Sequence, residues 1–318
     1  MHLLLLLATS LFFSTMSHLS AIEHHTEINL SGGYRNDQLA SKIDLTTTPP
    51  QVPTVNSALK SKIDDISIGQ IGFDGRIMFP YSSDPCCEFY FLNNFYLDGF
   101  AYWGWSGEGN KLHLTDEEDE RTTSTHIKLK EIQTDDYQVG LGYLFDDDCW
   151  AFGVSAGYAY NSQKIKSKGG EISTPSNIDL LTDPLFSDGY KTKTHWQGPW
   201  VGVELYYDWC HWAFTLGYEY HFATYHQTHK NPSSMPNIAS KIKANDAYGN
   251  VVYLDAIYRF CGGWQAGFEF KYQDWQARHG HVTTHHANIT LPPDETLKAK
   301  ANAQWQSYSI MADIGYAF

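Results

Sequence analysis

The sequence has few basic residues and no apolar segment long enough to cross a bilayer as a helix. Lys and Arg number 22 against 36 Asp and Glu, which gives a formal net charge of −14. Clustered Lys and Arg bind nucleic-acid phosphates, so this balance argues against a nucleic-acid partner. The longest apolar run, Leu3–Phe13, is shorter than the about 20 residues that a membrane-spanning helix needs. The mean hydropathy of the chain is −0.40, which is too low for a helical membrane protein.

The apolar run at the N-terminus has the length and position of a secretory signal peptide. Small residues follow it at Ser17, Ser20 and Ala21. We therefore expect residues 1–21 to direct export and residues 22–318 to form one domain.

Cysteine is scarce as well, with five in the chain. An exported chain can oxidise its cysteines, and an odd number leaves at least one without an intrachain partner.

Aromatic residues, in contrast, make up 15% of the chain and recur at a regular spacing. In the segment "WAFTLGYEYHF", Trp212–Phe222, bulky apolar residues occupy every second position. Ala213, Gly217 and Glu219 are among the small or polar residues between them. A period of two is the pattern of a β-strand with one apolar face and one small or polar face. The same alternation in segments 137–145, 150–160, 252–260 and 308–318 predicts an all-β protein.

Three features favour a transmembrane antiparallel up-and-down β-barrel over a soluble β-sandwich. The predicted strands are long, aromatic residues gather near both ends of the apolar faces, and short turns alternate with long polar connections. A sheet in lipid must close, because an open edge would leave backbone groups unpaired. We predict ten strands: Ile28–Ile43, Lys62–Phe79, Glu88–Ser106, His126–Phe145, Trp150–Ile165, Gly189–Tyr207, His211–Gln227, Ala244–Phe260, Trp264–His281 and Lys300–Phe318.

The connections predict how the barrel is oriented. The turns near 80–87, 146–149, 208–210 and 261–263 are short, as periplasmic turns are. The other connections are long and polar, as extracellular loops are: Asp44–Ser61, Glu108–Thr125, Lys166–Asp188, Thr228–Lys243 and Val282–Lys298. The last predicted strand ends on an aromatic residue, Phe318, which resembles the terminal signal of bacterial outer-membrane barrels. We therefore expect a location in the bacterial outer membrane.

The polar faces of the strands predict the lining of the barrel lumen. Acidic residues are in excess on these faces, so an open lumen would favour cations. A barrel of about eight strands is filled by side chains, so ten strands allow a narrow pore at best. Ten charged residues are predicted to face the lumen: Asp74, Arg76, Asp98, Glu204, Glu219, Asp255, Arg259, Glu269, Lys271 and Asp313.

Ten strands with five long outer loops resemble the omptin family of outer-membrane proteases. The segment "QGPWVGVELYYDW", Gln197–Trp209, looks like the omptin strand and turn after the third outer loop, and "FGVSAGYAY", Phe152–Tyr160, looks like the fifth strand. Cysteines at the turns depart from that family. Chain length, turn cysteines and aromatic strands look like the Protochlamydia outer membrane protein family of chlamydia-like bacteria, a resemblance that implies a porin.

The omptin resemblance implies two catalytic clusters, a pair of carboxylates and an Asp–His dyad that activates water. Asp116 and Asp119, in the acidic run 114–121, lie where the resemblance places the carboxylates. His226 and His229 lie where it places the dyad, but no Asp or Glu occurs in the segment 225–230. A histidine base needs a carboxylate to orient it, so the protease pattern is half met. We expect no enzyme activity.

Four histidines in the last outer loop region, His279, His281, His285 and His286, could in principle bind zinc or copper. No cysteine or carboxylate lies close to them in the sequence, and a loop preorganises ligands poorly. We therefore predict no metal site and no cofactor.

All five cysteines fall at predicted short turns: Cys86, Cys87, Cys149, Cys210 and Cys261. Neighbouring turns are two strands apart, roughly 12 Å from strand spacing and tilt. A disulfide needs Cα atoms within about 7 Å. This geometry favours bonds to other molecules, either a second barrel or another envelope protein, with free thiols as the alternative.

Three functions stay open at this point. The first is a porin-like channel for small solutes or ions. Disulfides could link such a channel to other envelope proteins. The second is a structural or adhesive surface barrel, to which the long loops and the cysteines point. The third is an omptin-like protease. In each case outer-membrane lipid is the expected partner.

Overall fold

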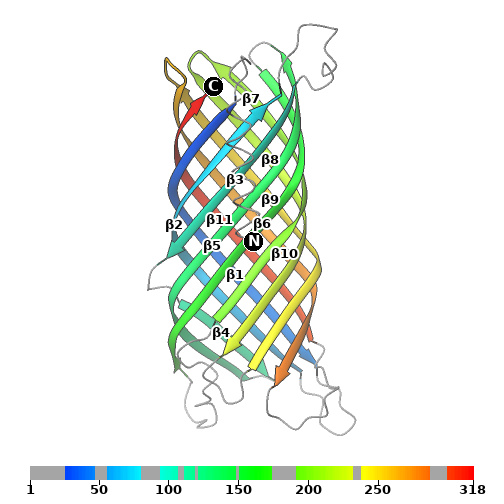
Figure 1. Ribbon diagram of the computed structural model, residues 1–318. Helices are drawn as coiled ribbons and strands as arrows, with labels where there is room; N and C mark the ends of the chain where they lie inside the picture. The colour runs from blue at the N-terminus through cyan, green and yellow to red at the C-terminus, as the bar shows by residue number, and fades with distance from the viewer. Residues whose placement is uncertain are drawn as a thin grey trace.

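The computed structural model describes residues 26–46, 56–79, 94–106, 111–118, 121–147, 150–173, 191–231, 238–286 and 299–318, which form an antiparallel β-barrel (Figure 1). Its strands are β1 (Glu27–Thr46), β2 (Asn56–Met78), β3 (Phe95–Ser106), β4 (Lys111–Glu118), β5 (Arg121–Asp147), β6 (Trp150–Ser173), β7 (Lys191–Trp209), β8 (Trp212–Asn231), β9 (Ile238–Arg259), β10 (Trp264–His286) and β11 (Ala299–Ala317). No helix long and apolar enough to cross a membrane occurs among these residues.

The sheet closes on itself through β1, which pairs with both β2 and β11. Leu30, for example, faces Ile314 on β11 and Phe73 on β2. The short strands β3 and β4 both lie between β2 and β5, so they share one position in the wall. The eleven strands therefore make a closed barrel of ten positions, which confirms the predicted strand number and fold class.

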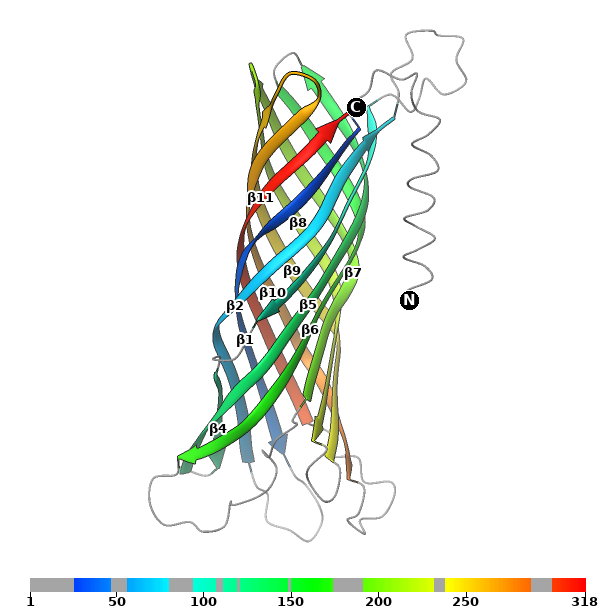
Figure 2. The same cartoon turned by 60° about the vertical axis from the view of Figure 1, so that its left-hand side comes forward.

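The strands extend farther from the membrane than the alternation predicted. The predicted loop Glu108–Thr125 contains β4 and the start of β5, and β6 continues to Ser173 rather than Ile165. In Figure 2 these ends lie at the bottom of the barrel, opposite the C-terminus. Outside lipid the outward face need not be apolar, so the alternation fades there although the backbone ladder continues. β3 begins at Phe95, and residues 88–93 of the predicted third strand lie outside the described residues.

An apolar band covers the outward face near the short turns. Leu30, Val139, Leu216 and Ile310 are among its exposed residues. Aromatic residues border the band at both ends, including Trp209 next to a short turn and Phe222 at the far edge. This is the surface of an outer-membrane barrel. We call the strand segments beyond the far edge, which include residues 191–196, 223–231 and 238–247, the outer extension.

Small residues on the inward face create room for large ones. A β-carbon at Gly217 would overlap the ring of Tyr253, and one at Gly142 would overlap that of Tyr96. Small inward residues suggest free space when the sequence is considered alone. In the folded barrel the space beside these two glycines is taken by the aromatic side chains of other strands. The membrane section of the barrel is consequently well filled.

Candidate functional site: the barrel lumen

A polar cavity of about 120 Å³ lies inside the membrane section of the barrel. Its lining extends from Glu27, at the start of β1, to His221 and Trp275. Eight carboxylates and two basic side chains line it: Glu27, Asp74, Asp98, Glu204, Glu219, Asp255, Glu269 and Asp313, with Arg76 and Lys271. Nine of the ten residues predicted to face the lumen are in this lining. The tenth, Arg259, lies at the exposed rim and pairs with Asp208 at 3.2 Å.

Glu204 on β7 has both hydrogen-bond donors and a cation as partners. It accepts hydrogen bonds from the hydroxyls of Tyr96, at 3.1 Å, and Tyr253. Arg76 Nη2 lies 3.2 Å from its Oε2. The guanidinium of Arg76 also packs 4.5 Å from the ring centre of Tyr96. Two tyrosine hydroxyls and one guanidinium thus stabilise the Glu204 carboxylate, and a buried ion pair needs such partners if it is not to destabilise the fold.

The other acidic residues of the lining have fewer basic partners. Lys271 Nζ lies 3.0 Å from Glu269 Oε1, and it packs 4.5 Å from the ring centre of Phe100. Asp255 is the direct cross-strand neighbour of Glu269, so two carboxyl groups face each other. Such a pair destabilises a sheet unless a cation compensates it. With two basic side chains for eight carboxylates, the lining carries an excess of acidic groups.

Glu219 and His221 on β8 form a buried pair at the end of the cavity next to Trp275, whose ring centre lies 4.7 Å from that of His221. His221 Nε2 lies 2.9 Å from Glu219 Oε2, and Gln138 donates a hydrogen bond to Oε1 at 2.8 Å. Both residues lie on the small and polar face of segment 212–222, but His221 was not among the residues predicted to line the lumen. The i, i+2 spacing on a strand was the signal that could have found the pair.

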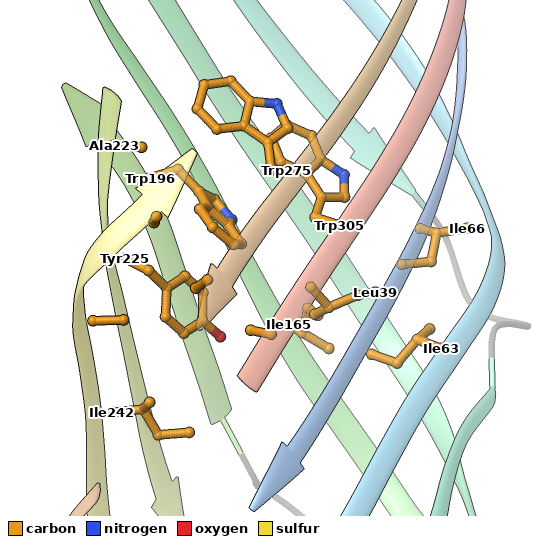
Figure 3. Close-up of a cluster of buried hydrophobic side chains, with 14 of the residues drawn as sticks. Leu39, Ile63, Ile66, Ile165, Trp196, Ala223, Tyr225, Ile242, Trp275 and Trp305 are labelled. Atoms are coloured by element: carbon orange, nitrogen blue, oxygen red, sulfur yellow. The ribbon is translucent and has the colours of Figure 1, made fainter. Parts of the chain in front are cut away.

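An aromatic layer begins at Trp275 in the cavity lining and continues toward the outer extension, and Figure 3 shows its side chains. Trp275 and Trp305 stack at 5.8 Å between ring centres, and Trp196 lies 6.0 Å from Trp275. Tyr225 packs 4.4 Å from Trp196. We define these four residues as the aromatic layer, and each is 1% exposed or less. Ile63, Ile66, Leu129, Ile132 and Ile165 are buried in the same apolar cluster.

A buried ion cluster lies beside the aromatic layer. Arg35 Nε is 2.7 Å from Asp37 Oδ1, and its Nη1 pairs with Asp136. The guanidinium packs 4.9 Å from the ring centre of Trp305. Gln163 donates to Asp37 at 2.7 Å. The side chains of the cluster and of the aromatic layer are almost fully buried, so both lie in the interior of the barrel.

The two candidate catalytic histidines lie on opposite faces of β8. Asp116 lies on β4, and Asp119 is outside the described residues. His226 faces outward and stacks on His195 at 5.0 Å, whereas His229 faces inward and contacts Thr192 at 2.9 Å. Burial lowers the pKa of His229 to about 4, so this imidazole is neutral at pH 7.

The remaining candidate residues lie on the outer surface or at the turns. Within the described ranges no group of three His, Cys, Asp or Glu is arranged to hold a metal, and His279 and His281 are exposed on β10. Cys210 and Cys261 are exposed, unpaired thiols in the β7–β8 and β9–β10 turns. The other three cysteines, Cys86, Cys87 and Cys149, lie outside the described residues, as does the predicted signal peptide.

Comparisons with known proteins agree with this architecture. A family model described as "Protochlamydia outer membrane protein" matches residues 29–318. Among solved structures, the outer membrane protease OmpT from Escherichia coli is similar with a TM-score of 0.70 and 14% identity, over 93% of this chain and 97% of that one. The outer membrane protein OprG from Pseudomonas aeruginosa has a TM-score of 0.37 and 12% identity, over 92% of this chain and 96% of that one. No curated protein matches the chain.

Proposed function

Because the chain belongs to the Protochlamydia outer membrane protein family and is an outer-membrane β-barrel, we propose that it is a narrow channel for small cations that is closed in the present conformation. The likeness to OmpT, at 14% identity, concerns the fold alone. The observation that carries the proposal is the charge of the lumen, where eight carboxylates share two basic partners.

The excess of carboxylates needs an explanation, since charges removed from water are costly unless they are paired. A barrel filled only for mechanical stability gains nothing from Asp255 opposite Glu269. A channel for cations does gain, because rings or clusters of carboxylates attract cations and set ion preference. The aromatic layer then serves as the closed gate, since apolar constrictions block ions by excluding water. A structural or adhesive barrel is the competing hypothesis.

The first prediction concerns ion preference. In planar bilayers with a KCl gradient, we expect the refolded protein to give small, intermittent current steps. Their reversal potential should have the sign that indicates selectivity for K⁺ over Cl⁻. Asp255→Asn with Glu269→Gln should move that potential toward zero, because two of the eight lining carboxylates are neutralised. The matched control is Asp208→Asn, which removes a carboxylate at the exposed rim. Anion preference, or an equal shift in the control, would contradict the proposal.

A second proposal concerns how the barrel is held in the envelope. We propose that Cys210 and Cys261 form disulfides with other molecules, either a second barrel or another envelope protein. Both thiols are exposed at short turns. Cys210 also has a positive φ of 55°, which Gly or Asn would adopt more readily. A cysteine at such a position suggests that the thiol itself is required.

Electrophoresis of alkylated envelopes without reductant tests this second prediction. We expect a band of higher mass that a reductant converts to the monomer. Cys210→Ser with Cys261→Ser should deplete that band, whereas Ser155→Ala, inside the barrel, should leave it unchanged. A monomer band that is insensitive to reductant would rule out intermolecular disulfides.

A further inference from the structure

Five lysines form an exposed group on the outward face of three adjacent strands. They are Lys191 and Lys193 on β7, Lys230 on β8, and Lys241 and Lys243 on β9, and we call them the outer lysine cluster. All five belong to the outer extension. The cluster is unexpected in a chain with a net charge of −14, since it gathers cations where the overall composition is acidic.

The strand register brings these cations close to one another. Lys191 is the direct cross-strand partner of Lys230. Thr228 lies between Lys193 on one side and Lys241 on the other, and His226 is the partner of Lys243. Like charges that face each other directly destabilise a sheet. The arrangement therefore lowers the stability of the barrel unless an anion compensates it.

The protein itself does not supply that anion within its described residues. None of the five lysines forms an ion pair there. The neighbouring lysines of β6 behave differently: Lys164 lies 3.3 Å from Asp135, and Lys166 lies 2.6 Å from Glu131. Lys164 and Lys166 are the direct cross-strand partners of Lys193 and Lys191, so the two groups are adjacent, but among the described residues only the β6 lysines have a carboxylate partner on the next strand.

The position of the cluster indicates where the anion comes from. Along β8 the outward residues change from Lys230 to His226 and then to Phe222, at the edge of the apolar band. Tyr220 packs 4.9 Å from Phe222 and 6.3 Å from Tyr248 on β9, which continues the aromatic border. Aromatic residues mark the interface between hydrocarbon and headgroups. The outer lysine cluster therefore lies on the headgroup side of that border.

Two histidines between the lysines and the aromatic border carry little of the charge. Burial, followed by the neighbouring His226 and Lys193, lowers the pKa of His195 to about 4. Burial and Lys243 also lower the pKa of His226. Both imidazoles are therefore mainly neutral at pH 7. The positive charge of this face resides on the lysines.

We propose that the outer lysine cluster binds the phosphate groups of anionic lipid headgroups in the outer leaflet. Phosphates at the headgroup level compensate the facing lysines and explain why no carboxylate is needed on β7, β8 or β9. The proposal is independent of whether the lumen conducts ions. It depends on charge and position outside the barrel wall.

The test uses the full-length folded protein in neutral detergent, with bis-phosphorylated lipid A as the probe and native mass spectrometry as the readout. The variant is Lys193→Gln, Lys241→Gln and Lys243→Gln combined. Each lysine near an anionic surface contributes about 1 kcal/mol, so we expect binding roughly a hundredfold weaker. Raising the salt concentration should weaken wild-type binding as well. Lys42→Gln with Lys62→Gln is the matched control and should bind close to the wild-type level, since these lysines lie on β1 and β2, outside the cluster, and pair with Asp44 at 2.7 Å and Asp64 at 2.8 Å.

Two further arms separate the sources of phosphate. Dephosphorylated lipid A should bind the wild-type barrel as weakly as lipid A binds the triple variant. Millimolar inorganic phosphate should not displace the lipid. Unchanged binding by the triple variant, an equal loss in the control, or displacement by inorganic phosphate would each overturn the proposal.

Discussion

Replacing Trp275 and Trp305 with alanine should turn a mostly closed barrel into one with frequent, resolved conductance steps. The two indoles stack at 5.8 Å, and both are almost fully buried. Removing them deletes two of the four side chains of the aromatic layer. Water and ions can then pass from the polar cavity to the outer extension, because the constriction no longer excludes water. Single-channel recording measures the frequency and size of the steps.

The same substitutions lower the stability of the barrel. Each Trp→Ala change in a packed interior costs about 3–5 kcal/mol. Folding is therefore checked first by the shift in electrophoretic mobility between heated and unheated samples. Trp275→Leu provides a milder change that keeps an apolar side chain, and it should increase conductance less than the double alanine variant.

A lipid-facing tryptophan is the control for this prediction. Trp209→Ala removes an indole that is 59% exposed at the other end of the barrel, and it should leave conductance unchanged. If folded double variants conduct no more than the wild type, the aromatic layer is not a gate. The structural-barrel hypothesis would then be the better one.

The alternation of side chains was sufficient to predict the wall of the barrel and the facing of most charged residues. Glu219, Glu269 and Asp313 line the cavity because a period of two places them opposite the apolar face. The number of barrel positions followed from the spacing of turns. These properties are local, so a single segment of sequence carries the information.

The contents of the lumen could not be predicted in the same way. Arg35 and Asp136 lie 101 residues apart, and they meet because of the stagger between strands around the barrel. Trp275 shares the inward face of β10 with Lys271, yet an aromatic residue in a membrane strand is more often expected to face lipid. Bulges add to the difficulty, since the register shift between Ala277 and Gly280 disturbs the alternation near His279.

Removing the charge of Arg35 should destabilise the barrel more than any other single charge change in its interior. Arg35 pairs with both Asp37 and Asp136, and the three side chains are 5% exposed or less. Arg35→Leu leaves two carboxylates buried without their cation. Breaking a buried ion pair in this way costs about 3–5 kcal/mol. The loss should appear as a lower urea midpoint for unfolding, monitored by tryptophan fluorescence or by heat-modified mobility.

Neutralising the two acids at the same time shows how much of the lost stability comes from unpaired charge and how much from lost packing. The triple variant Arg35→Leu, Asp37→Asn and Asp136→Asn has no unpaired charge, so it should recover much of the lost stability. Lys164→Leu is the matched control, since its partner Asp135 is partly exposed at the surface and such pairs contribute about 1 kcal/mol or less. If Arg35→Leu alone costs no more than the control, the buried ions are compensated by water rather than by one another. In that case the section beside Trp305 is not sealed, and the closed state would depend on the indoles alone.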